Sequence, residues 1–288
     1  MLDKITRAKS ATAKGTESFY IPRDLILYAL SLGVHHTDLS LVFEGHPAFG
    51  ALPVFGLVPF FNAKAPYEMS DILSKYDQRL LLHVDQYLEI RSPIPLSGTL
   101  MTFPKLVQVV DKGKDAVVVQ GFTTVDENKK VVFYNETTVL VRGAGGFGGD
   151  SQLQDRGAAT ARNLPPSRSP DHVIEEKTSE GQAALYRLNG DLNPLHIDPA
   201  FSRKGGFDIP ILHGLCSLGI AGKHVYQTYG SFKNLKGKFT SPVLPGQTLR
   251  TEMWLESEVI FQAIVLETGK KALSAAAVTL DSAPSARL

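Results

Sequence analysis

Residues 189–199, NGDLNPLHIDP, place two carboxylates, an amide and an imidazole in one short stretch of the chain. Pro194 forbids an ordinary helix interior there, so we expect a loop. Within this loop, Asp191 and His196 could form an acid–base pair, and the Asn193 amide could hold a water molecule or the loop itself. Asp and Asn are also good turn and cap residues, so composition alone leaves a cap and a catalytic loop both open.

A buried helix is predicted shortly after this loop. The segment after Pro210 carries apolar residues at helical spacing, namely Leu212, Leu215, Leu218, Ile220 and Val225. Gly214, Gly219 and Gly222 lie in the same segment, and each costs about 1 kcal/mol relative to alanine inside a helix. Something must therefore approach that backbone closely. A sheet wrapped round the helix, or a ligand on the Gly214 amide, would explain the glycines.

The elements that must position these residues occur twice in the chain. Three strands separated by turns are predicted at 106–110, 115–125 and 130–141, and three more at 248–257, 259–267 and 272–280. SPIPLSGTL at 92–100 lines up with SPVLPGQTL at 241–249, and each stretch leads into such a three-stranded meander. A period of about 150 residues is too long for a solenoid and suggests two fused copies of one domain.

The polar residues belong to the second copy only. Where the second copy has NGDLNPLH, the first has SLGVHHTD, and PILHG in the second copy faces PVFG in the first. If the polar groups served only to close a turn of the fold, both copies would need them. Because copies that share a fold need not share a site, this contrast favours chemistry in the second copy.

The stretch YRLNGDLNPLHIDPAF, followed by PILHGLCSLG, resembles the signature of the R-specific 2-enoyl-CoA hydratases, the hydratase 2 group of the MaoC-like dehydratases. The resemblance covers nearly the whole chain and implies an α+β fold of two fused hot-dog domains, each an antiparallel sheet wrapped round a central helix. It also implies reversible hydration of trans-2-enoyl-CoA to (3R)-3-hydroxyacyl-CoA in peroxisomal fatty acid β-oxidation.

The same resemblance implies roles for individual residues. Asp191 and His196 are expected to be the catalytic acid–base pair, and Asn193 and the backbone N–H of Gly214 to bind the substrate, Gly214 as the oxyanion donor. His213 is expected to be a structural neighbour of that turn rather than a base. The resemblance implies no metal, no cofactor apart from the coenzyme A of the substrate, and a homodimer.

The coenzyme A and acyl ends of the substrate leave weaker signals. The cations nearest the loop in sequence are Arg187, Arg203, Lys204, Lys223 and Lys236. Most lysines and arginines are solvated surface, so none of these is singled out as a site. The first copy could provide an apolar tunnel for a long acyl chain, and FGLVPFF at 55–61 is either its lining or plain core.

We predict an N-terminal hot-dog domain at 1–142 without the catalytic motif, a linker at 143–170, and a C-terminal catalytic hot-dog domain at 171–288. The linker is rich in Gly, Ser, Arg and Pro and lacks apolar periodicity. Gly143, Gly145 and Gly148 have the spacing of a dinucleotide-binding fingerprint. We reject that interpretation because no helix is predicted to open directly after them.

Composition limits the possible partners and the compartment. A formal charge of +1 argues against nucleic-acid binding, and no run approaches the roughly 20 apolar residues of a membrane span. The single Cys216 excludes an intrachain disulfide framework and fits a reducing compartment. Ala286-Arg287-Leu288 has the small, basic, leucine order of a peroxisomal address, which predicts recognition by the peroxisomal import receptor.

Two other functions stay open from the sequence. A hot-dog acyl-CoA thioesterase also uses a lone carboxylate and a helix amide, although this loop is not its usual pattern. A non-catalytic acyl-CoA-binding subunit could keep the loop only for its shape. Thiol release would reveal the thioesterase, and undiminished turnover in Asp191 or His196 variants would remove that residue from the mechanism.

Overall fold

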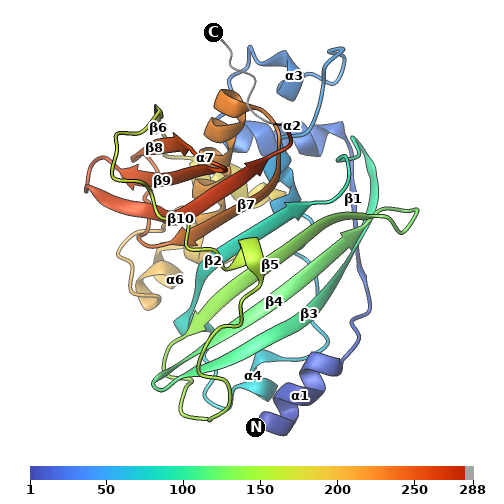
Figure 1. Ribbon diagram of the computed structural model, residues 1–288, viewed down its shortest axis with the longest axis vertical. Helices are drawn as coiled ribbons and strands as arrows, with labels where there is room; N and C mark the ends of the chain where they lie inside the picture. Colours follow the sequence, from blue (N-terminus) through green and yellow to red (C-terminus); the bar gives the residue numbers. More distant parts are fainter. Residues whose placement is uncertain (283–288) are drawn as a thin grey trace.

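The computed structural model describes residues 1–282 (Figure 1). The predicted targeting tripeptide, Ala286-Arg287-Leu288, lies outside the described residues. No helix among residues 1–282 has the length and apolar character that crossing a bilayer would require.

The first copy consists of five strands with short helices before and between them. Its strands are β1 (Thr16–Tyr20), β2 (Leu81–Ile90), β3 (Gly98–Lys112), β4 (Asp115–Val125) and β5 (Val131–Val141). Its helices are α1 (Leu2–Ser10), α2 (Pro22–Ser31), α3 (Leu39–Val42) and α4 (Met69–Ile72), with 3₁₀ turns η1 (Pro53–Leu57) and η2 (Gln78–Leu80).

The second copy repeats the five-strand plan. Its strands are β6 (His172–Lys177), β7 (Phe232–Phe239), β8 (Thr248–Leu255), β9 (Val259–Val265) and β10 (Lys270–Leu280). Its helices are α5 (Gln182–Tyr186), α6 (Pro199–Lys204) and α7 (Gly214–Tyr229), with 3₁₀ turns η4 (Arg187–Asn189) and η5 (Pro194–His196). A further turn, η3 (Gly157–Ala159), lies between the copies.

All ten strands form one antiparallel sheet in the order β1-β3-β4-β5-β2-β7-β10-β9-β8-β6 (Figure 1). Read inward from either edge, the order is the same: first, third, fourth, fifth and then second strand of each copy. The copies meet at the β2–β7 pair, where Asp85 lies opposite Lys238 and Glu89 opposite Asn234. This topology confirms the predicted duplication and the α+β class of fused hot-dog domains.

The three predicted strands of each copy are present as β3 to β5 and β8 to β10. In β3, buried residues alternate with less buried ones from Leu100 to Gln108, as expected for a strand that covers a core with one face. The strands that form the outer edges and the centre of the sheet were not predicted from the sequence, namely β1, β2, β6 and β7.

The expected central helix is present in the second copy only, as α7, so this expectation is wrong for the first copy. Between β1 and β2, the described residues of the first copy contain only short helices, and the 3₁₀ turn η1 packs where a long helix was expected. Pro53 and Pro59 bracket this segment and leave too few residues between them for a long helix.

The glycines of α7 are explained by how closely the first copy approaches it. A Cβ atom on Gly222 would lie 2.5 Å from Cγ1 of Val54 in η1, and one on Gly219 would lie 2.7 Å from Cδ2 of Leu32. Both neighbours are fully buried. The first copy therefore packs directly onto the backbone of the helix that begins at Gly214.

The segment between the copies is attached to the first one by polar contacts. Gln108 on β3 donates to the Asp150 carboxylate (3.1 Å), and Arg156 forms a buried ion pair with Glu136 on β5 (2.9 Å). The amides of Gly146 and Gly148 donate to the carboxylate of Asp111, and the next helical element is the short η3. The glycine-rich segment at 143–148 thus differs from a phosphate-binding turn. The domain limits inferred from the sequence stay predictions.

Candidate active site

The polar loop begins at the end of η4, where Asn189 and Gly190 turn the chain. The Asn189 amide donates to the Tyr186 carbonyl (2.8 Å) and to the hydroxyl of Ser31 on α2 of the first copy (3.0 Å). Gly190 has φ of 120°, a backbone conformation that favours glycine. Both copies therefore fix the backbone that leads into Asp191.

The middle of the loop is closed by its own side chains. The Asp191 carboxylate accepts from the main-chain N–H of Asn193 (3.3 Å). The side-chain Oδ1 of Asn193 accepts from the main-chain N–H of Leu195 (3.1 Å) and caps η5. Pro194 occupies the first position of η5, where its missing N–H costs nothing. The exposed Asn193 side chain thus holds the loop by capping η5, while its expected contact with the substrate stays a prediction.

His196 lies at the end of η5 and is 8% exposed. Its Nδ1 donates to the carbonyl of Ile211 (2.9 Å), which leaves Nε2 with a free lone pair in the neutral ring. Burial lowers the pKa of His196, and the Ile211 bond and the Asp191 carboxylate oppose this effect only in part. The neutral ring can therefore accept a proton at Nε2.

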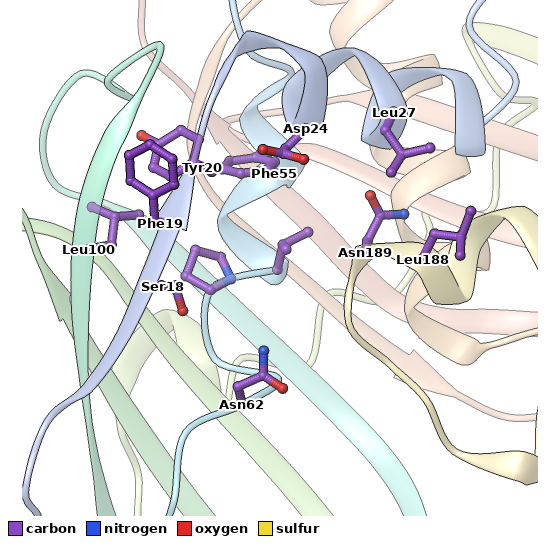
Figure 2. Close-up of a pocket in the computed structure, with 12 residues that line it drawn as sticks. Ser18, Phe19, Tyr20, Asp24, Leu27, Phe55, Asn62, Leu100, Leu188 and Asn189 are labelled. Carbon is purple, nitrogen blue, oxygen red and sulfur yellow. The ribbon is translucent and has the colours of Figure 1, made fainter.

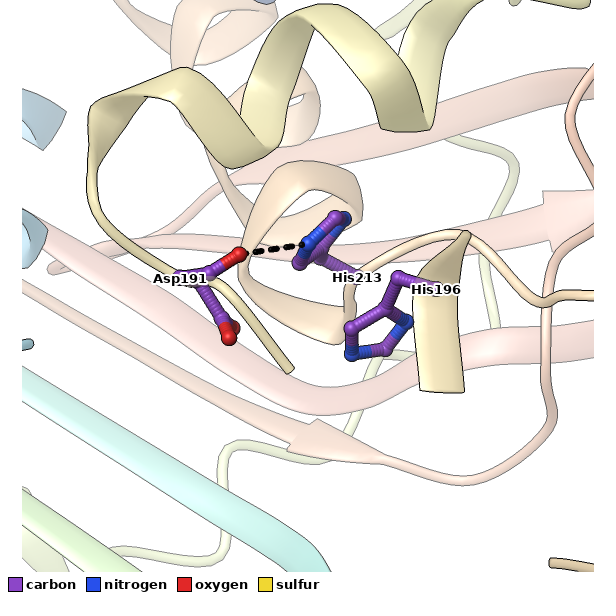
Figure 3. A group of neighbouring side chains, drawn as sticks. All are labelled: Asp191, His196 and His213. Atoms are coloured by element: carbon purple, nitrogen blue, oxygen red, sulfur yellow. Dashed lines mark hydrogen bonds between the residues drawn. The ribbon is translucent and has the colours of Figure 1, made fainter. Parts of the chain in front are cut away.

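Asp191, His196 and His213 converge on one point (Figure 3), with an oxygen of Asp191 and a nitrogen of each ring all within 4.8 Å of one another. His213 is 1% exposed and its Nε2 donates to the main-chain carbonyl of Asp191 (3.3 Å). The rings of His196 and His213 are stacked with centroids 3.8 Å apart. The structure thus brings the two predicted catalytic side chains together, with His213 beside both.

Gly214 follows His213 directly as the first residue of α7. Its N–H has no carbonyl partner within the helix, and the His213 side chain does not cap the helix. A Cβ on Gly214 would lie 3.1 Å from the ring of Phe239 on β7, so a larger residue would require this ring to shift by a few tenths of an ångström. A free amide at the positive end of a helix suits a developing oxyanion, the role that the family resemblance implies for Gly214.

The five cations nearest the loop in sequence fall into different environments. Lys223 is 1% exposed and is bound to Glu176 (2.5 Å) and the Leu32 carbonyl (2.8 Å), so it is structural. Lys236 is 5% exposed and donates to the Ala161 carbonyl in the segment between the copies. Arg203 and Lys204 are exposed on α6, and Arg187 is half-buried on η4. Only the last three are free to meet a substrate.

A cavity of about 160 Å³ opens between the first copy and η4 (Figure 2). Phe55, Val58 and Pro59 line one wall, and Leu188 and Asn189 line the other. Leu57, by contrast, is fully buried. The segment 55–61 is therefore partly core and partly the lining of a cavity that ends at the residues before Asp191.

Three contributors to this site have no signal of their own in the sequence. The Ile211 carbonyl that orients His196 is a main-chain group, and Ser31 lies far from Asn189 along the chain. Phe239 comes from β7, a strand that was not predicted.

Family models match both copies. The description "MFE-2 hydratase 2 N-terminal domain" matches residues 19–143, and "MaoC like domain" matches residues 161–276. A Neurospora crassa protein, "Peroxisomal hydratase-dehydrogenase-epimerase", is 53% identical over 97% of this chain, which spans only 32% of that protein. An Arabidopsis thaliana protein, "Enoyl-CoA hydratase 2, peroxisomal", is 38% identical over 90% of each chain.

Two solved structures share the fold. A "MaoC-like dehydratase" from Phytophthora capsici is 31% identical with a TM-score of 0.86, over 98% of this chain and 99% of its own. Full-length "peroxisomal multifunctional enzyme type 2" from Drosophila melanogaster is 37% identical with a TM-score of 0.82, over 93% of this chain and 48% of its own. The first curated relatives are thus much longer than this chain, which spans 30% to 45% of them.

Proposed function

Because this chain belongs to the enoyl-CoA hydratase 2 family of MaoC-like dehydratases, we propose that it adds water reversibly to trans-2-enoyl-CoA to give (3R)-3-hydroxyacyl-CoA. The observation that carries the proposal is the convergence of Asp191 and His196 on one point, beside the helix that begins with the Gly214 amide. The names of the relatives support placing the reaction in peroxisomal β-oxidation.

The reaction needs a base for water, a proton for C2 and a donor for the thioester oxygen. As water adds to C3, the Asp191 and His196 pair takes its proton, and the pair returns a proton to C2, so no proton is gained or lost overall. The neutral His196 ring offers Nε2 for this exchange. The amide of Gly214 would donate to the thioester oxygen as negative charge develops there, an effect worth roughly a hundred- to a thousand-fold in rate.

We further propose that the cavity beside Phe55 and Val58 receives part of the acyl chain, because its lining includes Asn189, two residues before Asp191. Arg187, Arg203 and Lys204 are the cations we propose for the phosphates of coenzyme A, since Lys223 and Lys236 are buried. A homodimer, recognition by the import receptor and a reaction without metal or redox cofactor stay predictions.

The test follows loss of the enoyl-thioester ultraviolet absorbance and free thiol in the same sample, followed by chiral analysis of the product. We expect Asp191→Asn and His196→Gln each to lower turnover at least about a hundred-fold, the usual loss for an acid–base group. Asp198→Asn is the matched control, because Asp198 caps α6 through the Ala200 amide (2.8 Å) and Asn can replace it there.

Thiol release without hydration would show a thioesterase and overturn the proposal. Turnover within a few-fold of the parent protein in Asp191→Asn or His196→Gln would remove that residue from the mechanism. A run of the same assay in EDTA checks the expectation that no metal is needed.

A further inference from the structure

His213 is a side chain that touches both proposed catalytic residues. Its ring stacks on that of His196 with an interplanar angle of 28°, and its Nε2–H donates to the main-chain carbonyl of Asp191. It is also the residue before Gly214, at the start of α7. Each of the three groups needed for hydration is therefore fixed relative to this one imidazole.

We infer that His213 is a positioning residue, which sets the orientation of His196 and its distance from Asp191 without itself exchanging a proton with the substrate. This inference rests on the proposed hydration and adds a residue to it. The His196 ring is also held by the Ile211 carbonyl, which accepts from its Nδ1. That single hydrogen bond still lets the His196 ring rotate about the bond. The stack removes this freedom.

The tautomer of His213 shows that packing alone does not explain why this residue is a histidine. Because Nε2 carries the proton, Nδ1 is an acceptor, and it is buried without a hydrogen-bond partner among residues 1–282. An unpaired buried acceptor costs stability, and an apolar ring of similar shape would avoid that cost. A histidine kept here is explained by what its N–H does, which is to hold the backbone of Asp191.

His213 remains neutral while it performs this role. Burial and the neighbouring His196 lower its pKa to about 3, while the bond to Asp191 opposes the shift. The other titratable or charged groups facing the two rings are the Asp191 carboxylate, Arg187 and Tyr186. A neutral His213 stacked on His196 also keeps water away from that ring, which favours the neutral form that can accept a proton.

Two variants separate the bond from the stack. His213→Phe keeps an aromatic ring against His196 but loses the bond to Asp191, and we expect kcat to fall about ten-fold with KM within two-fold and no loss of thermal stability. His213→Ala removes both contacts and admits water, so we expect a larger fall in kcat. In His213→Ala, the acid limb of the pH profile of kcat should move up toward 6.5, the ordinary pKa of histidine.

The same shift can be read without substrate, by NMR titration of the His196 ring, assigned with His196→Gln. We expect its pKa to rise in His213→Ala and to stay low in His213→Phe. Unchanged kcat in both variants, or an unchanged His196 pKa in His213→Ala, would overturn the inference. If the parent protein proves inactive as a hydratase but the NMR shift is present, the proposed function fails and the positioning role stands.

Discussion

The close packing of the first copy on α7 makes a sharp prediction at Gly222. Gly→Ala inside a helix is normally stabilising by about 1 kcal/mol. At Gly222 the new Cβ would lie 2.5 Å from Cγ1 of Val54, about 1 Å inside an ordinary carbon–carbon contact. Val54 is fully buried and its carbonyl accepts from Tyr28 (2.8 Å), so it cannot move away freely. Overpacking of this kind costs about 1–3 kcal/mol.

The net expectation for Gly222→Ala is a loss of about 1 kcal/mol in the free energy of unfolding, where helix propensity alone would give a gain of the same size. Urea unfolding of the parent protein, Gly222→Ala, Val54→Ala and the double variant measures it. Val54→Ala removes the clashing methyl group, so its cost should be smaller in the Gly222→Ala background than in the parent protein, by about 1 kcal/mol or more.

Gly219→Ala serves as the comparison, because its Cβ would meet the terminal methyl groups of the longer Leu32 side chain rather than a methyl group on a β-branched residue. A higher urea midpoint in Gly222→Ala, or additive effects of the Gly222 and Val54 changes, would refute the argument that η1 occupies the space above α7.

Two further predictions concern contacts that hold the site. Ser31→Ala removes the hydroxyl that accepts from Asn189, so we expect kcat for hydration to fall several-fold while KM and the thermal midpoint change little, measured by steady-state kinetics and calorimetry. Glu176→Gln leaves the buried Lys223 without its carboxylate and should lower the free energy of unfolding by about 3 kcal/mol at neutral pH, measured in urea. Burial raises the pKa of Glu176, but the hydrogen bonds and charges of His224 and Lys223 outweigh this effect and lower the pKa overall. The contribution of Glu176 to the free energy of unfolding is therefore complete above the ordinary pKa and is lost as the pH falls through the lowered value. The gap between parent and variant should therefore close in acid, and a gap independent of pH would contradict the assignment.

The sequence predicted those parts of the fold and site that depend on nearby residues. The six strands of the two meanders follow from runs of β-branched and aromatic residues between turns, and α7 from apolar spacing. Asp191 and His196 are separated by only four residues, so one proline-stiffened loop is enough to bring them together. A helix was expected after Pro210, and it begins at Gly214, so Leu212 lies just before it.

What the sequence could not predict depends on contacts between the copies. In the sequence, Lys223 resembles a solvated cation near the motif. In the structure both copies cover α7, and the charge of Lys223 is buried against Glu176. Ser31 meets Asn189 across 158 positions of the chain. The missing central helix of the first copy is signalled by Pro53 and Pro59, but only the structure shows that η1 then packs against Gly222.

The pairing of β2 with β7 within one chain affects how such a site can evolve. In one chain the two half-sheets meet intramolecularly, at an effective concentration set by the connecting segment, so their pairing does not weaken on dilution. Each active loop is therefore always accompanied by one first copy, in a fixed ratio. Because this ratio is fixed, the first copy need not carry catalytic residues itself. Substitutions in it can then reshape the cavity beside Asn189 without a matching change beside Asp191.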